Sequence, residues 1–144
     1  MEIKRMPGNA FFLDSSYVIA LAYASDQHRA RALQVAAAIE KNRTRLVTTR
    51  AVLLEIGSAL SKTKIRRDAI RLINALQASS QLEIIPLTEE IAIHGWNFFC
   101  QRLDKEWSWT DCISFVVMKE RGLNEALTSD QHFEQAGFVA LLRP

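Results

Sequence analysis

Four acidic residues of this sequence stand beside apolar segments and far apart along the chain. Asp14 directly follows one short apolar run, and Asp130 closely follows another. Glu55 and Asp111 lie in segments whose apolar residues recur at helical spacing. Glu55 in particular has apolar helical neighbours, and buried acids are almost always partnered. We therefore ask what chemistry these four carboxylates would perform together.

Carboxylates that gather in one place repel one another strongly, and no basic residue stands beside these four in the sequence to offset the repulsion. A cation would neutralise such a cluster. Mg²⁺ and Mn²⁺ prefer oxygen ligands, and Mg²⁺ is often held by few carboxylates together with water and substrate phosphate. A metal held in this way orients and activates water for phosphodiester hydrolysis. The four acids therefore indicate metal-dependent hydrolysis of a phosphodiester.

Each acid also has a structural interpretation that needs no metal. Asp14 would cap a helix that starts at the next residue, and Asp130 would cap a short helix that starts at 132. Asp111 would interact favourably with the dipole of the helix that it opens. Glu55 is the hardest of the four to explain in this way. These alternatives stay open for each residue taken alone, and convergence of all four is the stronger signal.

The elements that would position these acids alternate between strand and helix. Apolar runs predict strands at 10–13, 46–49, 82–87, 126–128 and 138–142. Helical spacing predicts helices at 15–24, 28–41, 51–62, 66–79, 88–106, 110–121 and 132–136. This order predicts an α/β sandwich built on a mostly parallel sheet of five strands, with helices on both faces.

A parallel sheet would bring the four acids to one edge, because ligands bind beyond the carboxyl ends of its strands. Asp14 ends the first strand, and Asp130 follows the fourth. Glu55 lies in the second turn of the helix that leaves the second strand. A right-handed crossover brings the first turn of the helix that contains Asp111 back to the same edge. The sequence thus predicts that the quartet converges.

Length and composition limit the remaining possibilities. The chain has 144 residues and a net charge of +2, which predicts one domain over 10–144 after a polar N-terminal extension, 1–9. This charge excludes an acidic tail protein and a strongly basic nucleic-acid coat, but it does not exclude a nucleic-acid enzyme. Cys100 and Cys112 lack metal-site spacing, and we expect two buried thiols in a reducing cytoplasm. No apolar run approaches the ~18 residues of a membrane span.

The segments around the four acids resemble the signature segments of the PIN-domain ribonucleases. These segments are Phe12–Ser16, Leu54–Glu55, Trp109–Phe115 and Leu127–Phe133. Their order and spacing, and the length of the chain, are most similar to the VapC toxins of prokaryotic toxin–antitoxin modules. The resemblance implies a PIN-like three-layer sandwich whose acidic quartet is Asp14, Glu55, Asp111 and Asp130.

The same resemblance implies a Mg²⁺- or Mn²⁺-dependent endoribonuclease that acts on RNA and blocks translation in the cytoplasm. It also implies a cognate antitoxin, which inhibits the enzyme and supplies the DNA binding for autoregulation. We therefore expect no direct DNA binding by this chain alone, no association with a membrane, and a homodimer.

Several further residues are candidates for supporting roles. The hydroxyls of Ser15, Thr110 and Thr128 would orient a ligand or a water beside the acids, although helix capping is the favoured role for Thr110. A basic turn would follow an RNA backbone or contact the antitoxin, unless it is simply a solvated turn. Its residues include Lys62, Lys64 and Arg66. His28, His94 and His132 share no ligand spacing, and we expect no zinc site.

Two other functional classes fit a similar sheet. One is a phosphate-transfer enzyme with Asp14 as nucleophile, but such phosphatases usually carry a second aspartate two residues later, where this chain has Ser16. The other is a catalytically inactive binding module, against which the intact quartet argues.

Overall fold

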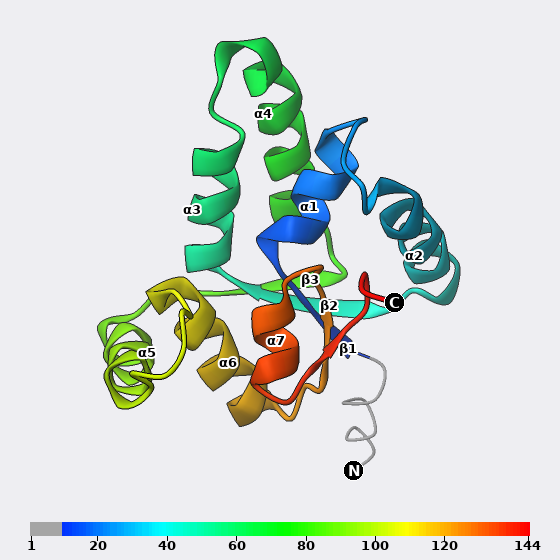
Figure 1. Ribbon diagram of the computed structural model, residues 1–144. Coiled ribbons are helices and arrows are strands. Elements are labelled where there is room, and N and C mark those ends of the chain that lie inside the picture. Colours follow the sequence, from blue (N-terminus) through cyan, green and yellow to red (C-terminus); the bar gives the residue numbers. More distant parts are fainter. Residues whose placement is uncertain (1–9) are drawn as a thin grey trace.

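Five short parallel strands form the centre of the molecule (Figure 1). The structure is a computed structural model that describes residues 10–144, so the predicted polar extension, 1–9, lies outside the described residues. The strand order is β3-β2-β1-β4-β5, and every neighbouring pair is parallel. The strands are β1 (Ala10–Leu13), β2 (Arg45–Thr49), β3 (Leu82–Ile85), β4 (Glu125–Leu127) and β5 (Val139–Ala140).

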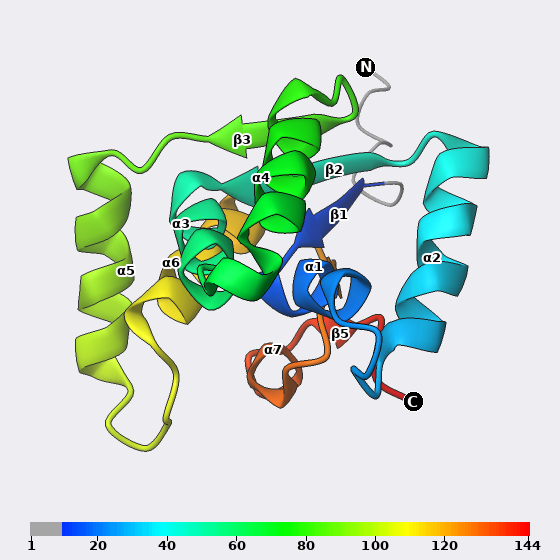
Figure 2. The ribbon, with the colours of Figure 1, turned by 90° about the horizontal axis from the view of Figure 1, so that it is seen from above.

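Helices cover both faces of this sheet, which confirms the predicted three-layer α/β sandwich. Figure 1 shows α1 to α4 above the sheet and α5 to α7 below it, and Figure 2 shows α2 and α5 at opposite ends of the molecule. This division follows from right-handed crossovers, because the chain moves outward from β1 to β3 and then returns past β1 to reach β4. The helices are α1 (Ser15–Ala22), α2 (Arg29–Asn42), α3 (Arg50–Ala59), α4 (Thr63–Ala78), α5 (Glu89–Gln101), α6 (Trp109–Arg121) and α7 (Gln131–Gln135).

The core lies around β1 and β4, which are buried from both sides. Phe12 and Leu13 of β1 are fully buried, and so are Leu127 of β4 and Phe133 of α7. Polar side chains interrupt this core mainly at the carboxyl ends of the strands and in the turns that follow. The buried polar residues there are Asp14, Ser15, Thr48, Thr49, Asp111 and Thr128. Buried polar groups need partners, so this edge is the natural place to look for a site.

The largest difference from the predicted elements is the end of α5, at Gln101 instead of 106. The chain turns at Arg102, whose guanidinium donates two hydrogen bonds to the carboxylate of Asp104. The turn lets the buried indole of Trp107 pack against Phe98 and Phe115. A helix continued to 106 would not place Trp107 in this aromatic core.

Three smaller corrections concern the end of β3, the start of α4 and one cysteine. β3 ends at Ile85 because the next residue is Pro86, which has no amide hydrogen to donate to a neighbouring strand. α4 begins at Thr63, three residues before the predicted start. The prediction of two buried thiols holds for Cys112 but is wrong for Cys100, which lies on the exposed side of α5.

Over residues 10–144, no helix is both long enough and apolar enough to cross a bilayer.

Candidate active site at the carboxyl edge of the sheet

Asp14 lies at the centre of the acidic edge, directly after β1. Its amide donates to the carbonyl of Leu127 at 3.2 Å, which holds the ends of β1 and β4 together. Oδ2 of its carboxylate accepts hydrogen bonds from the hydroxyls of Thr128 at 2.7 Å and Ser16 at 3.0 Å. Asp14 occupies the N-cap position of α1, but its side chain makes no capping bond. The capping interpretation therefore does not explain this carboxylate.

Glu55 reaches the same edge from α3. Thr49 caps this helix by accepting a hydrogen bond from the amide of Val52 at 3.2 Å, so α3 starts directly at the end of β2. The half-buried carboxylate of Glu55 lies one turn further and accepts a hydrogen bond from the hydroxyl of Ser15 at 2.8 Å. Ser15 thus orients Glu55, and the bond joins the first turn of α1 to the second turn of α3.

Asp111 is placed by the capping box at the start of α6. The hydroxyl of Ser108 accepts from the Asp111 amide at 2.9 Å, and Oδ2 of Asp111 accepts from the Ser108 amide at 3.1 Å. Ser108 is therefore the N-cap, and the predicted capping role of Thr110 is wrong. Thr110 is the second residue of the helix, half-buried beside Asp111.

Asp130 follows β4 and caps α7, because its Oδ1 accepts a hydrogen bond from the amide of His132 at 2.8 Å. Thr128 connects Asp130 to the centre of the cluster, since its hydroxyl accepts from the Asp130 amide at 3.0 Å while it donates to Asp14. The capping interpretation is thus correct for Asp130. It leaves Oδ2 of the same carboxylate available.

His132 joins the acidic edge, a contact that the sequence pattern does not predict. Its Nδ1 lies 3.0 Å from Oδ2 of Asp111 and 3.4 Å from Oδ1 of Asp130. One ligand atom from each of the three residues fits within 4.8 Å of the others. The signal in the sequence was the position of His132, two residues after an aspartate that begins a helical turn.

Burial dominates the electrostatics of this edge. Asp14 is 5% exposed, and its removal from water raises the pKa of its carboxyl group to about 6. The hydroxyls of Thr128 and Ser16 lower this pKa, whereas the negative charges of Glu55 and Asp111 raise it further. Burial likewise raises the pKa of Glu55 and of Asp111. The carboxylates are therefore close enough to oppose one another's ionisation.

The donor chemistry of these carboxylates is compatible with a hard divalent cation, and Asp111 and Asp130 lie in the group whose ligand atoms fit around one ion. Among residues 10–144, no lysine or arginine forms an ion pair with any of the four. Each carboxylate also keeps one oxygen that accepts no hydrogen bond from the described residues, and oxygen donors are the ligands that Mg²⁺ and Mn²⁺ prefer. These oxygens are Oδ1 of Asp14, Oε2 of Glu55, Oδ1 of Asp111 and Oδ2 of Asp130.

The predicted basic residues do not join the carboxylates. Lys62, Lys64 and Arg66 are exposed at the end of the α3–α4 hairpin, which projects away from the sheet (Figure 1). The ten residues of α3 span about 15 Å, so this tip stands well above the acidic edge. The side chain of Arg66 donates to the carbonyl of Ser61 at 3.1 Å.

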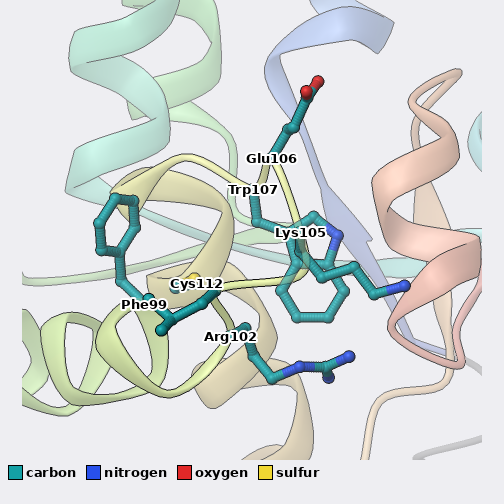
Figure 3. Close-up of a pocket in the computed structure, with 7 residues that line it drawn as sticks. Phe99, Arg102, Lys105, Glu106, Trp107 and Cys112 are labelled. Atoms are coloured by element: carbon teal, nitrogen blue, oxygen red, sulfur yellow. The ribbon is translucent and has the colours of Figure 1, made fainter.

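Two cavities lie near the start of α6. One, of about 400 Å³, is largely apolar and opens beside Glu55, with Leu54, Leu87, Trp109 and Thr110 in its walls. The other, of about 340 Å³, lies around the loop that follows α5, where the guanidinium of Arg102 stands 4.9 Å from the centre of the Trp107 ring (Figure 3). None of the four acids lines this second cavity, so only the first adjoins the candidate site.

The sequence of this chain matches a family model and two known proteins over most of its length. The family model described as PIN domain matches residues 11–139. The chain is 27% identical over 128 residues to the "23S rRNA-specific endonuclease VapC20" of two Mycobacterium tuberculosis strains, CDC 1551 / Oshkosh and ATCC 25618 / H37Rv. The alignment covers 89% of this chain and 95% of each relative.

Solved structures show the same architecture. The crystal structure of Mycobacterium tuberculosis VapC20, described as a Sarcin-Ricin loop cleaving toxin, superposes with a TM-score of 0.79 at 25% sequence identity. The superposition covers 90% of this chain and 96% of that one. FitAcB from Neisseria gonorrhoeae matches with a TM-score of 0.61 at 16% identity, covering 90% and 94%. This second likeness concerns the fold alone.

Proposed function

The chain belongs to the PIN-domain family, and on this premise we propose that it is a Mg²⁺- or Mn²⁺-dependent endoribonuclease that acts as the toxin of a type II toxin–antitoxin pair. The observation that carries the proposal is the acidic edge itself. Three of its four carboxyl groups have pKa values raised by burial, and no lysine or arginine among residues 10–144 pairs with any of the four. Such an arrangement is stable with a cation and costly without one.

Asp14, Glu55, Asp111 and Asp130 would hold the metal through the oxygens that their protein partners leave unused. When bound, a divalent ion supplies an activated water and stabilises the charge that develops on the phosphate. The hydroxyls of Thr128 and Ser15 keep the carboxylates of Asp14 and Glu55 in fixed orientations. Thr110, beside Asp111 and the apolar cavity, would contact the RNA.

RNA is the proposed substrate because two relatives that align along nearly their whole length are named 23S rRNA-specific endonucleases. Lys62, Lys64 and Arg66 would contact the RNA backbone from the tip of the α3–α4 hairpin, since exposed cations contribute sequence-independent attraction to phosphates. Structured ribosomal RNA is therefore the first substrate to test.

We also propose a homodimer and a cognate antitoxin, both in the cytoplasm. Support for the dimer comes from exposed apolar side chains that lie together around the start of α6: Leu54, Leu87, Trp96 and Trp109. An apolar patch of this kind marks an interaction surface. Leu54→Asp would shift the protein from dimer to monomer in sedimentation velocity, and a monomeric wild type would contradict the dimer.

The test of the function uses purified protein, intact ribosomes and isolated 23S rRNA, with Mn²⁺, Mg²⁺ or excess EDTA. We expect discrete cleavage of the RNA in either metal and none in EDTA. The 16S rRNA of the same ribosomes is the internal control for nonspecific degradation. Intact RNA after prolonged incubation with active-site metal bound would favour a catalytically inactive PIN-like module, whereas a covalent phosphoryl group on Asp14 would favour phosphate transfer.

A further inference from the structure

The side chain of His132 contacts the acidic edge at Asp111 but has no role in the proposed function. We propose that His132 is a positioning residue: its Nδ1–H holds Oδ2 of Asp111 and so turns Oδ1 of Asp111 toward the divalent cation. This inference rests on the proposed function for the presence of that cation. It concerns how the protein prepares a ligand and adds no new ligand.

The hydrogen bonds of Asp111 define the two roles of its oxygens. Oδ2 is 3.0 Å from Nδ1 of His132 and 3.1 Å from the amide nitrogen of Ser108. A carboxylate can only accept, so Nδ1 carries the hydrogen in this contact. Two donors on one oxygen fix the plane of the carboxylate, and Oδ1 has no partner among residues 10–144.

The backbone at His132 is held firmly, which a positioning role requires. The backbone amide of His132 donates to Oδ1 of Asp130 at 2.8 Å, which fixes the first turn of α7. The next residue, Phe133, is fully buried and packs edge-on against Phe115 of α6, with ring centres 4.9 Å apart. This contact ties α7 to the helix that contains Asp111, so the distance between His132 and Asp111 is set by the core.

The arrangement follows a general rule of metal sites: residues that hydrogen-bond to the metal ligands orient those ligands. Mutation of such a residue typically lowers metal affinity or activity by about 10- to 100-fold. Ser108 supplies one such contact to Asp111 from its own helix. His132 supplies the second from α7, which begins at Asp130. His132 thus connects two of the proposed ligands, Asp111 and Asp130, that lie far apart in the sequence.

The competing arrangement has His132 as a direct ligand through Nε2, with Asp111 behind it. Asparagine and glutamine separate the two possibilities. The amide nitrogen of asparagine can take the place of Nδ1 and donate to Asp111, whereas the amide of glutamine reaches the place of Nε2. The variants are therefore His132→Ala, His132→Asn and His132→Gln. His94→Ala is the matched control, because His94 faces the carboxylate of Glu120 at 3.8 Å on the exposed side of α5 and α6.

The experiment measures Mn²⁺ binding to each purified protein without RNA, by electron paramagnetic resonance of the free ion, and then RNA cleavage across a range of Mn²⁺ concentrations. Thermal unfolding in EDTA reports whether each variant folds. We expect His132→Ala to bind Mn²⁺ about 10-fold more weakly or worse and to regain cleavage at high Mn²⁺. His132→Asn should bind within a fewfold of wild type, and His94→Ala should match it.

Other outcomes overturn the proposal in distinct ways. Wild-type Mn²⁺ affinity in His132→Ala would show that the contact orients nothing. Recovery by His132→Gln but not by His132→Asn would make His132 a ligand through Nε2. If His132→Ala fails to fold, the comparison of the Asn and Gln variants decides alone. A wild type that binds Mn²⁺ but cleaves no RNA, with the predicted order of affinities intact, would contradict the proposed function and leave this inference standing.

Discussion

At the residue scale, hydroxyl, amide and imidazole groups hold the carboxylates of the acidic edge in place. Asp14 accepts hydrogen bonds from two hydroxyls, Glu55 from one hydroxyl, and Asp111 from one amide and one imidazole. These contacts orient the carboxylates, and no lysine or arginine among residues 10–144 pairs with them. The fold therefore keeps negative charge in a buried place, at a cost in stability that bound metal would offset.

Replacing Asp14 by asparagine should separate stability from function. The amide oxygen of the introduced side chain keeps both acceptor contacts with Thr128 and Ser16, while the buried charge is removed. We expect metal-free Asp14→Asn to be at least as stable as wild type at pH 7, with a gain in the free energy of unfolding on the order of 1–3 kcal/mol. We also expect the variant to lose RNA cleavage. Added Mn²⁺ should raise the melting temperature of wild type much more than that of the variant. Equal Mn²⁺-induced shifts would mean that Asp14 is not a ligand.

The raised pKa of Asp14 also predicts the pH dependence of the metal-free protein. Its carboxyl group titrates near 6 in the fold and near 3.8 when unfolded, so the folded state holds the proton more tightly. This contribution to stability is complete below about pH 4 and is lost as the pH rises through 6. Urea unfolding in EDTA from pH 4 to 8 should show this loss in wild type and a smaller one in Asp14→Asn. If the free energy of unfolding depends on pH in the same way in both proteins, the raised pKa of Asp14 is contradicted.

At the element scale, the sequence predicts well where helices and strands exist and less well where they end. The apolar run before Asp14 and the helical spacing around Glu55 are local signals, and both elements are observed. The end of α5 depends on Trp107 reaching the aromatic core, a long-range contact that no local pattern reveals. His132 was missed for the same reason, because its partner Asp111 is 21 residues away in sequence.

Two helical glycines give an element-scale prediction with a built-in control. A Cβ on Gly95 of α5 would lie 2.5 Å from Cγ1 and 3.1 Å from the backbone nitrogen of Ile113 in α6, so the two helices cross at backbone contact. We expect Gly95→Ala to destabilise the protein by about 1–3 kcal/mol and, because Ile113 is two residues from Asp111, to weaken Mn²⁺ binding. Chemical denaturation measures the first effect and calorimetry the second.

Gly57 of α3 is the matched control, since the nearest atom to an added Cβ is 4.0 Å away. Gly57→Ala should stabilise the protein by about 0.5–1 kcal/mol, because alanine loses less conformational freedom in a helix. If Gly95→Ala leaves the free energy of unfolding unchanged, α5 and α6 can separate without cost. The close crossing would then have no part in holding Asp111.

At the scale of the whole molecule, the topology explains how acids from four distant segments meet. β1 and β4 are neighbours at the centre of the sheet, so the residues that follow them, Asp14 and Asp130, share one edge. α3 starts at that edge because it directly follows β2, and a right-handed crossover returns the start of α6 to it. The shared edge could be predicted from the order of the elements, whereas the hydrogen bonds that orient each carboxylate could not. Binding of one cation by all four acids stays a prediction.

The proposed function predicts toxicity in a cell that lacks the partner protein. Induced expression of wild type should arrest growth and degrade RNA, while Asp14→Asn or Asp111→Asn should relieve the arrest at equal protein levels. Asp104→Asn is the control, because this exposed aspartate pairs with Arg102 outside the acidic edge and its loss should leave toxicity intact. Normal growth and intact RNA with soluble, metal-loaded wild type would contradict the toxin assignment.

The most direct test of the central claim is the dependence of RNA cleavage on metal and on Asp14 in one titration. Purified wild type, Asp14→Asn and Asp104→Asn are incubated with one structured ribosomal RNA while Mn²⁺ is raised from zero in EDTA-treated buffer. The account predicts that wild type and Asp104→Asn cleave the same bonds with the same Mn²⁺ dependence, and that Asp14→Asn cleaves none of them. Cleavage that persists in EDTA, or that survives in Asp14→Asn, would contradict the assignment of the acidic edge as a metal-dependent ribonuclease centre.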